Sequence, residues 1–460
     1  MYQINFEEPV HVHFIGIGGI SMSGLAEILL KEGFAISGSD AHESALTRHL
    51  AELGARIYYG QKAENLQEEI PSFVVYTAAV KEDNPEYQEA VRQKLPLMSR
   101  AELLGQIMSN YRLSVGISGT HGKTTTTSML TEILMDADMN PTISVGGIMK
   151  RIGGNIHVGD SPYFITEACE YTNSFFSLKP TIGIILNVMA DHMDFFKDMD
   201  DIRHSFRVYA ENIADDGALI INGTIPELSY FTEGLSCEIV TFGLDKAFDY
   251  SADNITYDEF GRPSYDLYIH GEFSTRLTLG VTGEHNVVNS LSAIAAAVAM
   301  QVPLEAIASG ITAYNGTDRR FQKKGEVNGC TVIDDYAHHP DEIRATLTAA
   351  RNYPHNRIWC IFQPHTYTRT KAFLKEFAET LCLADEIVLA EIYPARETDT
   401  LGISSLTLKE EIASLGKEAY YFSTFEEIEK FILKNCINGD LLITMGAGDI
   451  VNVGEALIKA

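Results

Sequence analysis

The sequence predicts an α/β protein of three domains, each built on a largely parallel sheet. Its 460 residues are too many for one ordinary hydrophobic core and suggest about three. Apolar runs of strand length alternate with stretches of helical periodicity, and this alternation begins anew near residues 112 and 324. Two of the apolar runs continue into glycine-rich turns that precede a helix. We therefore predict domains at residues 1–111, 112–323 and 324–460.

The first domain begins with the strand VHVHFIGIGG, the helix ISMSGLAEILLKEG and the strand FAISGSD, which together form a βαβ unit. The runs ARIYYG, SFVVYTAAV and PEYQEAVRQKL continue the alternation. A small Rossmann-like domain follows from this order of elements.

The second domain begins with the strand LSVGISGT and the helix HGKTTTTSMLTEILMDA. Further strands are predicted at FITEAC, IGIILNV and GALIING, and a long helix at SLSAIAAAVAMQ. Residues 249–279 have polar turns with Gly261 and Pro263 and predict additional antiparallel strands. This second domain is the largest and is also α/β, and with the phosphate-loop motif at 116–125 we expect it to be P-loop ATPase-like.

The third domain has strands at CTVIDD, RIWCIFQ, EIVLAEI, AYYF and LLITMG, each followed by a helical stretch. It reads as a second Rossmann-like α/β domain.

Composition narrows the possible functions. The net charge of -28 argues against a nucleic-acid partner, because phosphate backbones are bound by clustered Lys and Arg. The longest apolar stretch, LSAIAAAVAM, is too short for a membrane span, and MYQINFEEPV lacks the features of a secretory signal. The six cysteines contain no C-x-x-C pair and suggest neither disulfides nor a zinc site. We expect a soluble cytoplasmic protein without membrane insertion.

The turn GIGGIS at 16–21 suggests a site for a diphosphate. Gly16 and Gly18 would let a pyrophosphate approach the following helix N-terminus, and Asp40 stands where a ribose hydroxyl would be held. The NAD fingerprint requires glycine or alanine at position 21, where this chain has Ser21. A diphosphate other than NAD is therefore favoured, and a purely structural turn is the alternative.

The stretch GISGTHGKTT at 116–125 resembles a phosphate loop with one mismatch. The usual pattern, G-x-x-x-x-G-K-[ST], places its first glycine at position 117, where this chain has Ile117. The strand, the loop, Lys123 and the hydroxyl of Thr124 otherwise agree, so we predict that nucleotide phosphate binds here.

Acidic and histidine side chains after two later strands are candidate magnesium ligands: Glu167 and Glu170, then Asp191, His192 and Asp194. The carboxyl ends of parallel strands meet at one edge of a sheet, so these groups could converge on the loop. Taken singly, each is more often a solvated acid. GEHNVVN and DRRF are weaker signals, because an asparagine near a helix start is usually a cap.

The third domain contains DDYAHHP at 334–340 and FQPHTYTRTK at 362–371. Both follow apolar strands and are rich in His, Tyr and Arg, as a site for a carboxylate-bearing substrate would be. Ordinary surface loops are the alternative for each motif taken singly.

Together these motifs resemble the Mur ligase family over essentially the whole chain. The family's ATP loop has the form G-T-x-G-K-T, which GTHGKTT at 119–125 matches, so the glycine spacing belongs to this loop variant. GIGGISMSG with GSD, YTAAVKEDNPE, RAELL, ADHMD, GEHNVVN, RRF, DDYAHHP and FQPHTYTRT also match. The resemblance implies a UDP-sugar in the first domain, ATP with Mg²⁺ in the second and the amino acid in the third.

The implied activity is an ATP-dependent, ADP-forming amide-bond ligase. It would join L-alanine to the lactyl carboxylate of UDP-N-acetylmuramate through an acyl phosphate, in peptidoglycan precursor synthesis. A sister ligase that attaches a recycled murein tripeptide to the same UDP-sugar is the main alternative. A nucleotide sensor without ligase activity and a nicotinamide dehydrogenase are weaker ones. The oligomeric state is expected to be a monomer or a homodimer.

The resemblance also implies residue roles. The catalytic residues are Lys123, Glu167 and His192, and the metal ligands are Thr124, Glu167 and His192. ATP is assigned to Gly119, Thr120, His121, Gly122, Lys123, Thr124, Thr125, Asn286, Asn289, Arg320 and Asp335. The UDP-sugar is assigned to Gly16, Gly18, Gly19, Ser39 and Asp40, and the amino acid to Tyr336, His338, His365 and Arg369.

Three positions depart from the family pattern. Cys169 replaces an acid of the E-A-D-E-S motif, and Thr366 stands where an arginine is frequent, which leaves Arg369 as the expected carboxylate partner. Some sister ligases carry a carbamylated lysine in the helix after ADHMD. The counterpart here is Ser205, so we predict no such modification.

Overall fold

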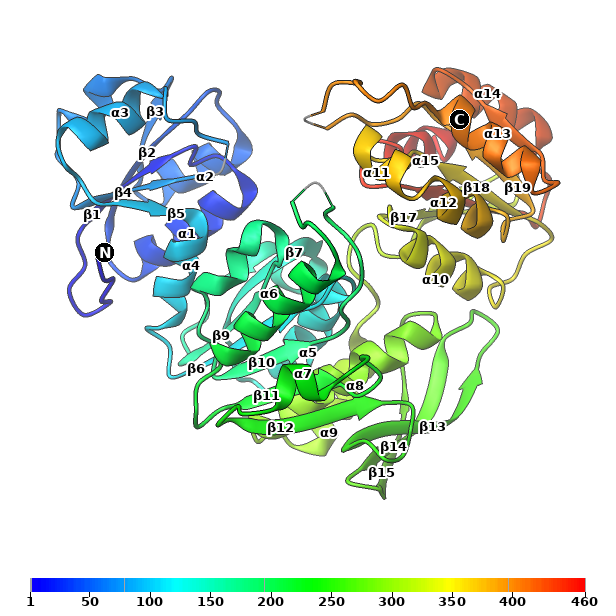
Figure 1. The fold of residues 1–460 in the computed structure, drawn as a ribbon, viewed down its shortest axis with the longest axis horizontal. Coiled ribbons are helices and arrows are strands. Elements are labelled where there is room, and N and C mark those ends of the chain that lie inside the picture. Colours follow the sequence, from blue (N-terminus) through cyan, green and yellow to red (C-terminus); the bar gives the residue numbers. More distant parts are fainter. Residues whose placement is uncertain (1, 78, 194, 396, 460) are drawn as a thin grey trace.

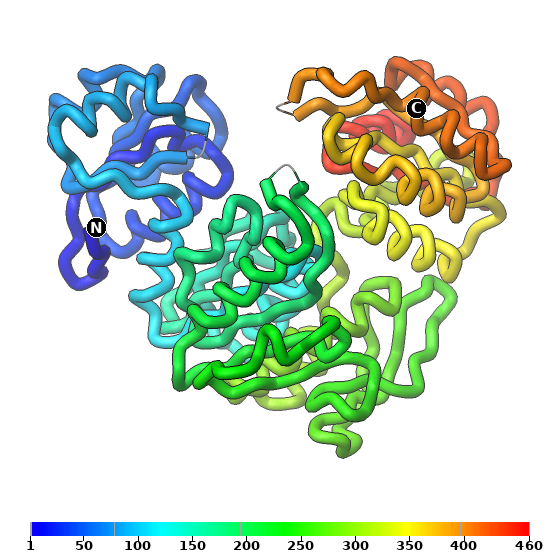
Figure 2. The backbone as a smooth tube through the Cα atoms, in the orientation of Figure 1, coloured from blue at the N-terminus to red at the C-terminus, as the bar shows by residue number. Residues whose placement is uncertain are grey.

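The protein folds into three α/β domains with three separate sheets, as seen in a computed structural model that describes residues 2–77, 79–193, 195–395 and 397–459. The middle domain lies at the vertex of a V, and the other two domains form its arms (Figure 1). The two chain termini lie in different arms (Figure 2). The fold class predicted from the sequence is confirmed.

The first domain has a five-stranded parallel sheet of order β3-β2-β1-β4-β5. Its elements are β1 (His11–Ile15), α1 (Ile20–Lys31), β2 (Ala35–Asp40), α2 (Ala45–Glu52), β3 (Arg56–Tyr59), η1 (Ala63–Leu66), β4 (Phe73–Tyr76), α3 (Pro85–Arg92), β5 (Leu97–Ser99) and α4 (Arg100–Met108). Helix α4 packs on η3 (Tyr171–Ser177) of the middle domain and joins the two hydrophobic cores.

The middle domain has a ten-stranded sheet of order β15-β14-β13-β12-β11-β10-β6-β9-β7-β8. Strands β13 to β15 are antiparallel, as residues 249–279 predicted, and the antiparallel edge strand β8 was not predicted. The elements are β6 (Leu113–Ser118), α5 (Lys123–Asp136), β7 (Thr142–Met149), η2 (Lys150–Ile152), β8 (Gly154–His157), β9 (Tyr163–Glu167), η3 (Tyr171–Ser177), β10 (Ile182–Ile185), α6 (Met199–Glu211), β11 (Ala218–Asn222), α7 (Ser229–Thr232), β12 (Glu238–Gly243), β13 (Tyr250–Tyr257), β14 (Pro263–Ile269), β15 (Glu272–Thr278), α8 (Glu284–Ala299) and α9 (Leu304–Ala313).

The third domain has a six-stranded sheet of order β16-β17-β21-β18-β19-β20, parallel except for the edge strand β16. Its elements are β16 (Gln322–Val327), β17 (Cys330–Asp335), α10 (Pro340–Ala350), β18 (Ile358–Phe362), α11 (Tyr367–Ala372), α12 (Leu374–Leu381), β19 (Glu386–Leu389), α13 (Ser405–Ser414), β20 (Ala419–Tyr421), α14 (Phe425–Asn435), β21 (Leu441–Met445) and α15 (Val451–Leu457).

Strand order explains where the functional loops meet. Strand β6 lies between β9 and β10, and all three are parallel, so the segments that follow them emerge at one edge of the sheet. Strand β17 is likewise next to β21, and the following loop enters α10 beside the middle domain (Figure 1). Among the described residues, no helix is long and apolar enough to cross a membrane.

Candidate active site

The phosphate loop joins β6 to α5 and depends on two glycines. Gly119 has a φ of +143° and Gly122 a φ of +89°. A Cβ atom would lie 2.8 Å from the Leu186 Cβ at Gly119 and 2.7 Å from the Asn289 Oδ1 at Gly122. Ile117, at the position of the expected first glycine, is fully buried inside β6. The conformation therefore requires glycine at 119 and 122 and an apolar residue at 117.

Asn187 holds this loop in place, and sequence reasoning missed it. The amide N–H of His121 donates to the Asn187 Oδ1 at 2.8 Å, and the Asn187 Nδ2 donates to the His121 carbonyl at 3.0 Å. The Thr120 N–H donates to the carbonyl of Asn187 at 3.2 Å. The one feature of the sequence that could have indicated this role is the position of Asn187, two residues after the end of β10, which is the neighbour of β6.

Lys123 at the start of α5 is held in a largely buried position. Its Nζ donates to both carboxylate oxygens of Glu170, at 2.8 and 3.1 Å, and to the carbonyls of Gly119 and Thr120. Burial disfavours the charged amine, but the Glu170 carboxylate outweighs this effect and raises the pKa of Lys123. The lysine is therefore a fixed cation at the mouth of the phosphate loop.

The candidate metal ligands lie around the same point. Glu167 accepts the N–H of Gly146 at 2.6 Å, and Cβ atoms on Gly146 and Gly147 would lie 2.8 Å from Glu167 and 3.0 Å from Thr124, respectively. The Nε2 of His192 lies 3.8 Å from carboxylate oxygens of both Glu170 and Asp191. Asp194 lies outside the described residues.

A cavity of about 630 Å³ opens beside the phosphate loop, between the middle and third domains. It is lined by seven of the residues that the resemblance assigned to ATP: His121, Gly122, Thr125, Asn286, Asn289, Arg320 and Asp335. Gly119 and Thr120 in the adjoining loop, and Lys123 and Thr124 in the first turn of α5, do not line the cavity. The cavity is large enough for a nucleotide.

The third-domain side of this cavity carries strongly perturbed carboxyl groups. Burial raises the pKa of Asp335 to about 6, although Arg320 opposes the shift, and its two oxygens accept the N–H groups of Phe321 and Ala337. Glu342, which sequence reasoning missed, lies 3.3 Å from the Nδ1 of His121 and 3.7 Å from the Nη1 of Arg320. Burial opposes ionisation of Glu342, but the neighbouring cations and histidines hold its pKa well below the usual range.

The predicted amino-acid residues form one cluster around Arg369. Its Nη1 lies 3.4 Å from the His365 Nδ1, and the His365 ring lies 5.7 Å from that of His338, which contacts Tyr336. Burial lowers the pKa values of His338 and His365 to about 4. Both rings are therefore neutral at pH 7.

Arg369 also joins the two domains. Its Nη2 donates to the Asp191 Oδ1 at 2.8 Å, and the two side chains are 11% and 8% exposed. Burial opposes the charge on Asp191, but Arg369 and the nearby histidines outweigh it and lower the pKa of Asp191. The third-domain cluster thus touches the loop that carries His192.

The three departures from the family pattern lie in different surroundings. Thr366 has a φ of +66° and caps α11 by accepting the N–H of Arg369, so its side chain serves the helix start. Burial raises the pKa of the Cys169 thiol. Ser205 is buried and donates to the Asn173 Oδ1 at 2.7 Å.

A second cavity, of about 660 Å³, lies in the first domain at the N-terminus of α1. Gly16, Gly18, Gly19 and Asp40 line it, together with Lys81. Asp40 accepts the N–H of Gly18 at 2.8 Å and thereby shapes the glycine turn. Ser39 does not line this cavity, because its side chain is fully buried and donates to Glu86.

Family comparisons cover all three domains. The Mur ligase family catalytic domain matches residues 11–112, the Mur ligase middle domain matches 117–297, and the family described as "Mur ligase, glutamate ligase domain" matches 319–448. Full-length relatives agree. The chain is 61% identical to the UDP-N-acetylmuramate–L-alanine ligase of Lachnospira eligens, with 100% of both chains covered. It is 47% identical to the ligase of the same name from Clostridium acetobutylicum, with 97% of both covered.

Solved structures show the same relationship. UDP-N-acetylmuramate-alanine ligase from Thermotoga maritima superimposes with a TM-score of 0.79 at 30% identity over 98% of both chains. A murein peptide ligase from Psychrobacter arcticus gives 0.69 at 25% identity, also over 98% of both. The three family domains match in the expected order, the relatives match over their full length, and the three-domain fold is shared. This chain therefore belongs to the Mur ligase family.

Proposed function

We propose that this enzyme joins L-alanine to the lactyl carboxylate of UDP-N-acetylmuramate, with cleavage of ATP to ADP and phosphate. The observation that carries the proposal is the contact between Arg369 and Asp191. It brings the groups expected to bind the amino acid against the segment that follows β10, next to the phosphate loop. The full-length relatives that carry this name support the same substrates.

The reaction needs two bond exchanges. A carboxylate oxygen of the lactyl group attacks the γ-phosphorus of ATP, the bond to the bridging oxygen breaks, and ADP leaves. The amine of alanine, after losing a proton, then attacks the acyl carbon and expels phosphate. Lys123 neutralises charge on the transferring phosphoryl group, which requires that Glu170 yield part of its contact with the amine.

Mg²⁺ fits the residues around the phosphate loop. The donors are oxygens of Thr124, Glu167 and Glu170 with the imidazole of His192, and a Cβ at Gly146 or Gly147 would fill the space beside Glu167 or Thr124. We propose that Thr124, Glu167 and His192 hold the ion. When bound, it supplies positive charge beside the β- and γ-phosphates.

Arg369 is the proposed partner of the alanine carboxylate. Since Asp191 already accepts from Nη2, the substrate carboxylate would share the guanidinium or displace Asp191. His338 and His365 contribute neutral rings to the cluster around Arg369. With a pKa of about 4, His338 is a poor acceptor for the ammonium proton of alanine.

We propose that the first-domain cavity binds the UDP-sugar. Its diphosphate would lie at the N-terminus of α1, where the backbone N–H groups are free of side-chain caps and Lys81 adds a cation. Asp40 would act through the glycine turn that it shapes.

Phosphate release from Mg-ATP and UDP-N-acetylmuramate tests the proposal. We expect release with L-alanine and none with L-alanyl-γ-D-glutamyl-diaminopimelate. Release only with the tripeptide would assign the chain to peptide recycling, and release with neither would make it a nucleotide-binding protein without ligase activity. Adding each amino acid in turn to the same reaction gives the selectivity for alanine over glycine and serine.

We further propose that the enzyme acts in the cytoplasm, where ATP and UDP-sugars are made, as a monomer or a homodimer. The proposed domains are 1–111, 112–323 and 324–460. The last boundary falls within β16, which begins at Gln322. Light scattering at several protein concentrations tests the assembly, and limited proteolysis tests the boundaries.

A further inference from the structure

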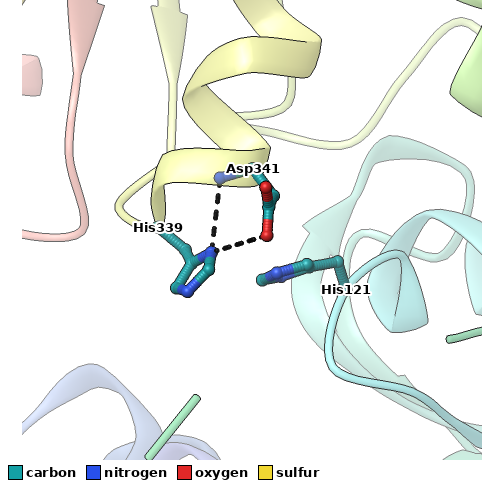
Figure 3. Close-up of side chains that lie close together, drawn as sticks. All are labelled: His121, His339 and Asp341. Atoms are coloured by element: carbon teal, nitrogen blue, oxygen red, sulfur yellow. Dashed lines mark hydrogen bonds and ion pairs between the residues drawn. The ribbon is translucent and has the colours of Figure 1, made fainter. Parts of the chain in front are cut away.

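His121, His339 and Asp341 form a cluster between two domains, which we call the seam cluster (Figure 3). His121 belongs to the phosphate loop of the middle domain, whereas His339 and Asp341 lie at the start of α10 in the third domain. One potential ligand atom from each residue lies within 4.8 Å of the others. The two imidazole rings are 4.9 Å apart.

One nitrogen of His121 lacks a hydrogen-bond partner. The Nε2 of His121 is buried and has no partner among the described residues. On His339, which is only 3% exposed, the nitrogen that faces Asp341 is Nδ1, 3.5 Å from the Asp341 Oδ2 (Figure 3). This Nδ1 accepts the N–H of Asp341 at 3.3 Å as the cap of α10, a contact that a cation bound at Nδ1 would replace. A buried polar atom without a partner is costly, and such an atom often marks the place of an ion or a water molecule.

The donor set suits a particular class of cation. Two imidazoles and a carboxylate are typical ligands of Zn²⁺ and of its neighbours Co²⁺, Ni²⁺ and Cu²⁺, whereas Mg²⁺ prefers oxygen. Ligand bonds of about 2.0–2.1 Å in a tetrahedral site place the ligand atoms roughly 3.4 Å apart. The Asp341 Oδ2 already lies 3.5 Å from the His339 Nδ1, and the Asp341 side chain is 44% exposed.

We propose that the seam cluster binds a divalent cation of the zinc class and that this cation inhibits the ligase. The bound ion would join the phosphate loop to α10, because its ligands come from both domains. His121 and Asp341 also line the nucleotide cavity, so the ion would restrict both the loop and the separation of the domains that releases product. The carboxylate of Glu342, 3.3 Å from the Nδ1 of His121, adds negative charge beside the site.

Co²⁺ is the probe for binding, because its visible absorption reports ligand number. We expect the full-length protein to bind one Co²⁺ with a tetrahedral spectrum that Zn²⁺ abolishes. His339→Asn should weaken binding at least tenfold. This variant keeps a good helix cap, since asparagine is favoured at that position. Asp341→Asn is the second variant and should weaken binding in the same direction. His204→Asn, which removes an exposed histidine of α6, should leave binding unchanged.

Inhibition is measured separately, as phosphate release in excess Mg²⁺ with increasing Zn²⁺. We expect Zn²⁺ to slow the wild-type enzyme and His339→Asn to be at least tenfold less sensitive. The inhibition rests on the proposed function, but the Co²⁺ spectrum does not, so the two can fail independently. Absence of saturable Co²⁺ binding, or equal affinity in wild type, His339→Asn and Asp341→Asn with unchanged circular dichroism, would overturn the proposal.

Discussion

The ion pair between Asp191 and Arg369 predicts how firmly the third domain is held against the middle domain. In Asp191→Asn the shape of the side chain is kept and the charge is lost, so the guanidinium retains only a neutral acceptor. A hydrogen bond between charged groups contributes about 1.5–3 kcal/mol. Because the two side chains are only 8% and 11% exposed, solvent screens the pair weakly, and we expect a loss of about 2 kcal/mol. This corresponds to a factor of roughly 30 in the equilibrium for local opening.

Hydrogen exchange of α11 measures this equilibrium. The helix carries Arg369 and the buried Thr370, so peptides that cover Tyr367–Ala372 should exchange about 30-fold faster in Asp191→Asn, in the absence of substrates. Asp200→Asn is the matched control, because it removes the same charge from an exposed position at the start of α6. Its exchange should equal that of the wild type.

Arg369→Gln completes a double-mutant cycle. If the pair acts as a unit, Asp191→Asn should accelerate exchange much less in the Arg369→Gln background than in the wild type. Exchange rates in Asp191→Asn within threefold of the wild type, or strictly multiplicative effects of the two substitutions, would refute the argument that this ion pair holds the domains together.

Three further predictions concern the phosphate loop and the nucleotide cavity. Lys123→Ala should lower kcat by about 10²–10³-fold, because the cation at the transferring phosphoryl group is lost. The double variant Lys123→Ala with Glu170→Gln also removes the carboxylate that the lysine leaves unpaired. Near-normal phosphate release in either variant would contradict this role of Lys123. Gly122→Ala should raise the KM for ATP at least tenfold, because the added Cβ would clash with Asn289. Gly153→Ala is the control: Gly153 also has a positive φ, but no atom lies within 4 Å of its added Cβ, so the KM should stay unchanged. Equal effects of the two substitutions would mean that backbone strain alone matters. Burial raises the pKa of Asp335 to about 6, above the unfolded value of about 3.9. The stability that the protonated carboxyl contributes is therefore present at low pH and is lost as the pH rises from about 3.9 through about 6. The Tm of wild type minus that of Asp335→Asn should fall over this pH range, and a difference that does not change with pH would count against the shift in pKa.

Much of the fold could be predicted from local patterns. Strands such as β1, β6 and β18 are largely apolar runs of five or six residues, and each is followed by a helix with its own periodicity. The edge strands β8 and β16 were not predicted, because they are half exposed and carry polar residues and therefore lack a strong apolar pattern. Their place in the sheet depends on pairing with β7 and β17.

The phosphate loop could also be predicted from the sequence, because Gly119, Gly122 and Lys123 lie within one turn and their spacing is local. The role of Asn187 in holding that loop could not be predicted, because a lone asparagine after a strand has many possible roles. Ser39 illustrates the opposite case: its motif suggested ligand contact, but burial turned its side chain toward Glu86.

The sequence by itself determined the alternation of strands and helices, the two glycine turns and the chemical character of each domain, because these depend on contacts between residues near one another in the chain. Only the tertiary structure decided that Asp191 meets Arg369, that Glu342 lies between His121 and Arg320, and that His121 faces His339. These partners are separated by 22 to 221 residues, and their encounter depends on how the middle and third domains pack. No local periodicity carries that information, so the site at the domain seam could be recognised only from the folded chain.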